Sequence, residues 1–373
     1  MTDFSSPNVF HFYRGRVALC ALLRATGVQP GDEVVLQAYT CLAVPAPIVG
    51  LGARPVYVDV DRDTYSFDLA DLERKLSKRT RAVIVQHTFG IPARLGEVLC
   101  LARRYGAKVI EDCAHACGST YEKRQIGRFG DAAFYSFEWG KPLVIGLGGV
   151  GVVNSAALLD SVRTIHDGLK VPPFKDMARV RVQYRLHQLF RRPAMFWLLR
   201  DVYRRLSARG IVVGSFDEDE IQGRLSDDYQ RKMPRSLQKR LARKSGREWL
   251  RAARRRAITE QYAAGCSRLG IDSIPIGPET VLLRYPVVTK DKARVLQGAR
   301  ARKIELGDWY SSPVHPLSGA ALSRIAGYEE GSCPTAEELA HRVVTFPVDP
   351  DSKGAAVERN LAFLGEMVTS GTV

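Results

Sequence analysis

Two short segments hold side chains whose types and spacing suit covalent and acid–base chemistry. VIEDCAHACG places Asp112 at the end of the apolar run AKVIE, with His115 three residues later. FYSFEWGKPLVIGLGG holds Ser136 and Lys141 five residues apart, just before a glycine-rich turn. Both segments follow an expected strand, where the side chains that act on a ligand tend to gather.

A third segment, FYRGRVALCALL, opens an expected helix at Gly15 and Arg16, and the free N–H groups of a helix start can hold a phosphate. The three segments together suit an aldehyde cofactor that carries a pyridine ring and a phosphate. A lysine forms a Schiff base with the aldehyde and shuttles protons. A carboxylate opposite the ring nitrogen keeps that nitrogen protonated, so that the ring can accept carbanion electrons. The residues therefore predict pyridoxal-phosphate chemistry, with Lys141 holding the cofactor.

The elements that must position these residues alternate between strand and helix from residue 15 to about 155. Helical spacing runs through GRVALCALLRATG, which stops at Gly27, through DLADLERKLSKR, with Asp68 as N-cap, and around LGEVLCLARRYG. The strand-like runs between them are VVLQAY, PVYVDV, AVIVQHTFG, AKVIEDC, AAFYSF and GVGVVN. Short apolar strands separated by helices indicate an α/β fold with a mostly parallel sheet covered on both faces.

Changes in composition along the chain predict three regions. Residues 1–160 and part of 225–265 would form the large cofactor-binding domain. Residues 161–225 would form a basic helical insertion. Residues 266–373 would form a small C-terminal α+β domain.

The composition is that of a globular protein in a reducing compartment. The chain has 373 residues, of which 45% are hydrophobic and 25% charged. The sequence has no run of about 18 uncharged apolar residues, so we expect no membrane span. Its N-terminus lacks the pattern of a secretory signal. Its seven cysteines are scattered without a CxxC pair, which favours the cytoplasm and argues against a disulfide framework or a metal site.

The net charge of +15 lies in one part of the chain. Residues 161–256 contain 25 Lys and Arg against 10 Asp and Glu, whereas the rest of the chain holds 30 of each sign. Such a segment can be a helical hairpin that packs within a dimer. It can also lie on an anionic membrane surface, here through residues 177–209 with Phe196 and Trp197. Nucleic-acid binding is not expected, because the sequence shows no recognised binding module.

The order of the motifs resembles the DegT/StrS family of pyridoxal-phosphate-dependent nucleotide-sugar aminotransferases. The similar segments are GRVALCALLRATGVQPGDEVVLQAYTC, GARPVYVDVDRDTYSFDLADLE, VQHTFGIPA, VIEDCAHACGSTY, GRFGDAAFYSF and CPTAEELAHRVVTFP, together with DDYQRKMP. They run over nearly the whole chain except roughly residues 160–225. The resemblance implies fold-type I, a seven-stranded-type sheet, a homodimer and an enzyme that uses pyridoxal 5'-phosphate.

Carried over residue by residue, the resemblance places the cofactor site on positions that the chemistry had already singled out. The Schiff-base lysine falls on Lys141, the carboxylate at the ring nitrogen on Asp112, and the residue beside the ring hydroxyl on His115. The phosphate-binding serine falls on Ser136. The start of the phosphate-binding helix falls on Gly15 and Arg16.

Other positions depart from the family's pattern or extend the site. The partner subunit's phosphate contact falls on Lys232 in DDYQRKMP, so the site would be complete only in a dimer. The usual ring-stacking aromatic residue is Cys41 here, which we interpret as a packing residue on the ring face and not as a nucleophile. A glutamate after the lysine is replaced by Leu147. His315, in WYSSPVHP, resembles a loop near the substrate.

The activity that the resemblance implies is transfer of an amino group from an amino acid, with glutamate as the family's usual donor, to a keto-sugar or related keto-substrate. Two alternatives remain open at this point. One is a different pyridoxal-phosphate-dependent reaction. The other is a degenerate member of the fold that acts as a membrane-associated scaffold or assembly subunit, which the altered Cys41 and Leu147 keep in view.

Overall fold

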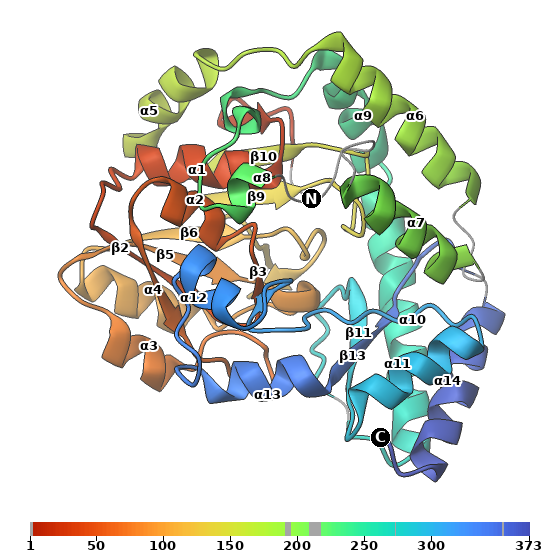
Figure 1. Ribbon diagram of the computed structural model, residues 1–373. Helices are drawn as coiled ribbons and strands as arrows, with labels where there is room; N and C mark the ends of the chain where they lie inside the picture. The colour runs from red at the N-terminus through yellow and green to blue at the C-terminus, as the bar shows by residue number, and fades with distance from the viewer. Residues whose placement is uncertain (1–2, 191–194, 209–217, 273, 353) are drawn as a thin grey trace.

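A seven-stranded sheet forms the centre of the molecule (Figure 1). The computed structural model describes residues 3–190, 195–208, 218–272, 274–352 and 354–373. In spatial order the strands are β1 (Val9–Phe12), β10 (Gly149–Val153), β9 (Ala132–Ser136), β6 (Lys108–Asp112), β5 (Thr80–Gln86), β2 (Glu33–Gln37) and β4 (Arg54–Val58). The strands from β9 to β4 pair in parallel, and β10 is antiparallel to both of its neighbours. The expected mostly parallel sheet is confirmed.

Alternate side chains along the strands pack in two separate apolar cores, one on each face of the sheet. Val34 and Leu36 of β2 pack in the core on one face of the sheet, whereas Val35 packs in the core on the other face. The first face is covered by α1 (Gly15–Ala25), α2 (Pro45–Gly50) and α5 (Ala156–Asp167), and the second by α3 (Leu69–Lys75) and α4 (Leu95–Arg104). Burial on both faces explains why these strands are apolar throughout and not alternating.

The residues expected to start and end helices are found at those positions. Asp68 caps α3 by accepting a hydrogen bond from the backbone N–H of Asp71 at 2.9 Å. Gly27 follows the end of α1 with a left-handed φ of 81°, which a glycine adopts without steric cost.

A second, two-stranded antiparallel sheet lies at the lower right of Figure 1. It joins β11 (Arg284–Val288) to β13 (Val343–Pro347) and packs among α10 (Glu248–Arg268), α11 (Lys292–Ala301) and α14 (Gly354–Thr369). The apolar core of the first sheet face continues into this region through Tyr285 and Phe346. The boundary expected at 265/266 falls within α10, and the three-region division stays a prediction.

Short elements complete the chain between these parts. They are η1 (Thr88–Gly90), β3 (Thr40–Cys41), β7 (Thr120–Tyr121), β8 (Arg124–Gln125), α8 (Glu218–Ile221), η3 (Asp227–Gln230), β12 (Val314–His315), α12 (Ala320–Ala326) and α13 (Pro334–Arg342).

The described helices of the basic region 161–256 include α6 (Phe174–Phe190), α7 (Phe196–Ala208) and α9 (Arg235–Ser245). Figure 1 shows α6 and α7 along the upper right rim of the molecule. Trp197 is buried, and its indole N–H donates a hydrogen bond to the carbonyl of Ile304 at 2.7 Å. Phe196 packs edge-on against Trp197 at 5.4 Å between ring centroids. The expectation that Phe196 and Trp197 face a membrane is therefore wrong, because α7 uses them to pack on the body of the protein.

Among the described helices, none combines the length and apolar character that crossing a bilayer requires.

Candidate active site

Lys141 and His115 meet at the carboxyl ends of β9 and β6. Lys141 lies in the turn after β9, and His115 lies in the turn after β6. The Lys141 Nζ and His115 Nε2 atoms are 3.0 Å apart, which is hydrogen-bonding distance. Burial of the His115 ring, together with the positive charges of Lys141 and Arg284, holds the pKa of His115 well below its usual value. The imidazole is therefore neutral at neutral pH.

Asp112, the last residue of β6, supplies a buried carboxyl group to the same region. Its Oδ1 accepts a hydrogen bond from the backbone N–H of Ala114 at 2.9 Å. Burial raises the pKa of Asp112, although the Ala114 hydrogen bond and the charge of Lys141 act in the opposite direction. Within the described ranges, Asp112 takes part in no ion pair. A cation placed beside this carboxyl group would favour its ionised form.

Ser136 and Gly15 bring the end of β9 against the start of α1. A Cβ atom added to Gly15 would lie 2.9 Å from the Cβ of Ser136, closer than real side chains approach. Glycine at this position therefore lets the half-buried Ser136 hydroxyl lie at the helix N-terminus. A hydroxyl beside the N–H groups of a helix start is a favourable site for a phosphate dianion.

Two buried arginines flank this helix start, and both are paired with carboxylates from distant parts of the chain. Arg16 forms an ion pair with Glu220, whose other oxygen accepts a hydrogen bond from the Tyr229 hydroxyl at 3.0 Å. Arg14 lies 3.1 Å from Glu138 and 2.7 Å from Asp228. Arg16 is thus at the predicted phosphate end of the site, but in this structure it holds a carboxylate of the acidic run 217–220, of which residue 217 lies outside the described residues.

Cys41 and His315 lie side by side at another edge of the site. β3 pairs in parallel with β12, and this pairing sets Cys41 opposite His315. Burial raises the pKa of the Cys41 thiol despite the nearby charge of Lys141, so the thiol is protonated and is a poor nucleophile. His315 accepts or donates a hydrogen bond at Nδ1 with the Ser311 hydroxyl at 2.8 Å.

Lys232 lies beside the segment that leads into α1. It forms an isolated bridge with Phe12, and its backbone N–H donates to the carbonyl of Lys170 at 2.9 Å. Leu147, in the turn after Lys141, is buried in a core formed with residues of β9 and β10.

Trp309 was not predicted, although it contacts both Lys141 and His115. Its indole ring is parallel to the His115 ring within 5°, with centroids 5.8 Å apart, and Lys141 Nζ lies 5.9 Å from the indole centroid. Arg284 lies 5.5 Å from the same ring, and a Cβ on Gly140 would come within 2.7 Å of it. The motif WYSSPVHP contains Trp309, but only the fold reveals that this loop lies against the turn of Lys141.

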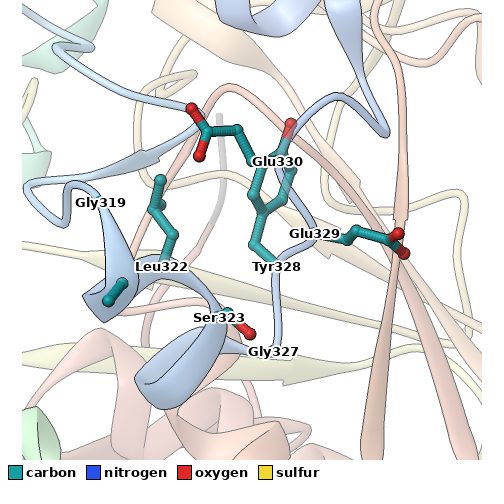
Figure 2. A pocket seen from close by; sticks show the side chains of 8 residues that line it. Gly319, Leu322, Ser323, Gly327, Tyr328, Glu329 and Glu330 are labelled. Atoms are coloured by element: carbon teal, nitrogen blue, oxygen red, sulfur yellow. The ribbon is translucent and has the colours of Figure 1, made fainter.

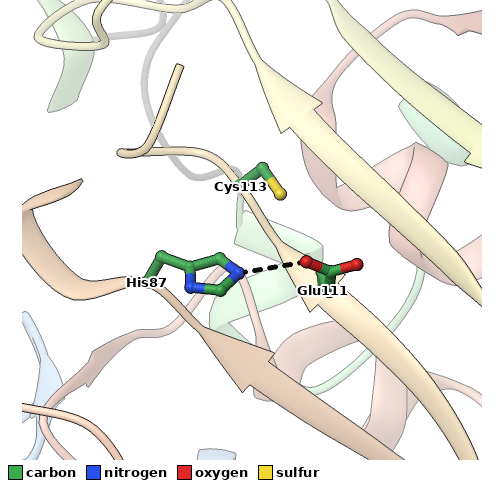
Figure 3. A group of neighbouring side chains, drawn as sticks. All are labelled: His87, Glu111 and Cys113. Carbon is green, nitrogen blue, oxygen red and sulfur yellow. Dashed lines mark hydrogen bonds and ion pairs between the residues drawn. The ribbon is translucent and has the colours of Figure 1, made fainter. Parts of the chain in front are cut away.

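His87, Glu111 and Cys113 form a buried cluster on the opposite face of β6 (Figure 3). Glu111 accepts hydrogen bonds from the backbone N–H groups of residues 127, 129 and 130 at 2.7 to 2.8 Å, and it lies 3.3 Å from His87 Nε2. His87 Nδ1 accepts from the N–H of Ala93 at 3.1 Å. Since these bonds already use the carboxylate and both ring nitrogens, the cluster is a structural anchor for the loop 126–130.

A hollow beside α12 lies apart from this site (Figure 2). It is lined by Gly319, Ala320, Leu322, Ser323, Gly327, Tyr328, Glu329 and Glu330. None of the predicted site residues lines it.

The seven-stranded, mostly parallel sheet with helices on both faces agrees with the fold-type I expected from the resemblance, and a solved structure shares this fold. Residues 8–187 match the model of the DegT/DnrJ/EryC1/StrS aminotransferase family. Over this part, which is just under half of the chain, the sequence is similar to that family.

Three known proteins illustrate the similarity. The chain is 38% identical over 152 residues to GDP-perosamine synthase of Escherichia coli O157:H7, a match that covers 41% of each chain. It is 40% identical over 142 residues to L-glutamine:scyllo-inosose aminotransferase of Streptomyces griseus, covering 38% of this chain and 34% of that protein. The crystal structure of S. venezuelae DesV in complex with a ketimine intermediate has a TM-score of 0.71 and 26% identity, covering 96% of this chain and 84% of DesV. The chain therefore aligns with about two fifths or less of these curated relatives in sequence, but with most of DesV in structure.

Proposed function

We propose that the protein is a pyridoxal-phosphate-dependent aminotransferase that moves an amino group from an amino acid to a keto-sugar or related keto-substrate. The observation that carries the proposal is the convergence of the Lys141 amine, the neutral His115 ring and the buried Asp112 carboxyl at adjacent strand ends. The GDP-perosamine synthase and the L-glutamine:scyllo-inosose aminotransferase among its relatives support this substrate class.

The residues present fit the cofactor. Asp112 is a buried carboxyl group without an ion pair in the described part of the chain, and a protonated ring nitrogen beside it would favour its ionised form. Lys141 would hold the aldehyde carbon, and His115 would lie beside the ring hydroxyl. Ser136 and the N-terminus of α1 at Gly15 and Arg16 would hold the phosphate. Bound pyridoxal phosphate supplies an electron sink for negative charge at the carbon next to the reacting nitrogen.

Three residues of the chain would have separate roles in the reaction. Lys141 Nζ accepts the α-proton of the amino donor and later returns a proton to the corresponding carbon of the acceptor. Asp112 would keep the ring nitrogen of the bound cofactor protonated through a charge-assisted hydrogen bond. Trp309 covers Lys141 and His115, which limits the access of water to them.

We further propose glutamate as the donor, a homodimer, and a role for Lys232 at the phosphate of the partner subunit's site. The family resemblance supports all three. A reducing, cytoplasmic location is supported by the seven cysteines, which are all free.

The test is the visible absorbance spectrum of the purified protein with added pyridoxal phosphate, followed by titration with glutamate and with glutamine. We expect a yellow protein whose spectrum is bleached by one of the donors, and an adduct that borohydride fixes to Lys141. Lys141→Ala should lose the adduct and the transfer activity, whereas Lys78→Ala, at an exposed surface position, should keep both. A wild-type protein that stays colourless with the cofactor would refute the enzyme proposal.

A further inference from the structure

Exposed large apolar side chains are concentrated on the basic helices. In the described part of the chain eleven such residues are exposed, and eight of them lie between residues 171 and 202. Those eight are Val171, Phe174, Val182, Leu186, Leu189, Phe190, Leu198 and Val202. A single exposed leucine needs no explanation, but a patch of this kind marks an interaction surface.

Every exposed charge on α6 is positive. The exposed ionisable residues of this helix are Lys175, Arg179, Arg181 and Arg185. Over the ranges that the structure describes, none of the four has an acidic partner. The helix has one acid, Asp176, which is half-buried and pairs with Arg231 at 3.3 Å. The outward face of α6 therefore combines apolar side chains with cations alone.

The inward face of α6 fixes which side of the helix points outward. Val180 is buried in a core that also contains residues of β9 and β10. Tyr184 lies under the guanidinium of Arg240 at 4.1 Å, and His187 lies against Trp139 at 4.5 Å between ring centroids. Because these contacts hold the helix, it cannot bury its outward face by rotating.

Positive charge also accumulates next to α6 on α9. Burial lowers the pKa of Arg240, and although the nearby Tyr184 opposes this shift, the charges of Arg243, Arg181 and Arg185 add to it. Cations from two helices thus lie close enough to repel one another, which favours an anion as their neighbour.

We propose that the outward face of α6, with its exposed apolar residues and cations, docks on an anionic phospholipid bilayer. Phosphate headgroups complement the cations, and Leu186, Leu189 and Phe190 would enter the headgroup boundary. Pairing of this face with the same face of a second copy is a poor alternative, because it would bring two surfaces that carry only cations together. This docking is independent of the proposed aminotransferase activity.

Docking through α6 would bring the Lys141 site close to the bilayer. His187 and Tyr184 on the inward face contact Trp139, two residues before Lys141. The active-site turn is thus separated from the docking face by the thickness of one helix.

The experiment is co-sedimentation of the full-length protein with vesicles of equal parts phosphatidylglycerol and phosphatidylcholine, and with phosphatidylcholine alone, at low and high ionic strength. We compare the wild type with the triple variant Arg179→Gln/Arg181→Gln/Arg185→Gln and with Leu186→Gln/Leu189→Gln. The matched control removes three exposed cations elsewhere, as Lys78→Gln/Arg103→Gln/Arg324→Gln. Chromatography with light scattering gives the oligomeric state of each protein.

We expect the wild type to bind the anionic vesicles and to lose binding as salt screens the charges. Removal of the three α6 arginines should lower the partition coefficient about 100-fold at low salt, since each cation contributes independently. The leucine variant should also bind more weakly, and the control should bind like the wild type. Absence of wild-type binding, or equal losses in the triple variant and the control, would overturn the proposal. So would an oligomer that the leucine variant dissociates without any vesicle binding, because α6 would then face another copy of the chain.

Discussion

Replacing Gly15 by alanine should weaken cofactor binding without disrupting the helix that Gly15 opens. The added Cβ would lie 2.9 Å from the Ser136 Cβ and 3.3 Å from its hydroxyl oxygen. To restore ordinary van der Waals contact, Ser136 must move by about 0.5 Å away from the start of α1. Gly354, which opens α14, is a matched control, because nothing lies within 4 Å of a Cβ added there.

The expected magnitudes follow from these contacts. Alanine in place of glycine favours a helix by at most about 1 kcal/mol, which is the whole effect at Gly354. At Gly15 the crowding against Ser136 opposes this gain by about 1–3 kcal/mol. At about 2.1 cal/mol/K per residue, the two variants should differ in Tm by about 1–4 °C. If Ser136 loses a charge-assisted hydrogen bond of about 1.5–3 kcal/mol, the affinity for pyridoxal phosphate should fall about 10- to 100-fold.

Both quantities can be measured on the purified variants. Thermal unfolding of the cofactor-free proteins gives the difference in Tm, and absorbance titration with pyridoxal phosphate gives the affinities. Equal Tm and equal affinity in Gly15→Ala and Gly354→Ala would refute the reasoning, since Ser136 would then not be confined by α1 or would not hold the phosphate.

Three further predictions concern other parts of the site and its support. The variant Asp112→Asn can keep the hydrogen bond from Ala114 but loses the negative charge. It should therefore still bind the cofactor but slow the half-reaction with the amino donor about 100- to 1000-fold, as measured by stopped-flow absorbance. Near-normal rates would place the ring-nitrogen partner elsewhere. Burial alone would raise the pKa of Glu111, but hydrogen bonds from His87 and from the N–H groups of the loop 126–130 lower this pKa below the usual 4.5. The Glu111 carboxylate therefore stabilises the fold above pH 4.5, and this stabilisation is lost as the pH falls through the lowered pKa. Glu111→Gln should therefore cost about 3–5 kcal/mol of unfolding free energy at neutral pH and reduce the dependence of Tm on acidification; an unchanged pH profile would contradict the anchor role. Trp309→Ala should expose Lys141, so that its acetylation in the cofactor-free protein, followed by mass spectrometry, becomes several times faster. An unchanged rate would show that the indole does not shield Lys141.

Much of the fold could be predicted because its signals are local. Strands buried on both faces are apolar along their whole length, as in β2 and β10, and they are readily distinguished from the amphipathic helices between them. The meeting of Asp112 and Lys141 was also predictable, because parallel strands bring their carboxyl ends to one edge of the sheet.

Contacts between distant parts of the chain could not be predicted in this way. The Arg16–Glu220 pair joins residues 204 positions apart, so the sequence pattern could not predict this carboxylate as a partner of Arg16. Trp197 is buried and donates a hydrogen bond to the carbonyl of Ile304, 107 positions away. No pattern within its own helix indicates this contact. Trp309 approaches the Lys141 turn through tertiary packing alone.

The neighbouring acids of β6 have a consequence for how the sheet assembles. Ile110 packs in one core and Val109 in the other, so Asp112 and Glu111 project to opposite sides of the strand. A slip of β6 by one position would turn each of these side chains to the other side of the strand, because strand side chains alternate. The loop 126–130 would then lose Glu111 at the same time as the ligand side lost Asp112. A misaligned sheet would therefore be both unstable and inactive. Only a correctly aligned sheet places Glu111 at the loop N–H groups and Asp112 on the ligand side at the same time.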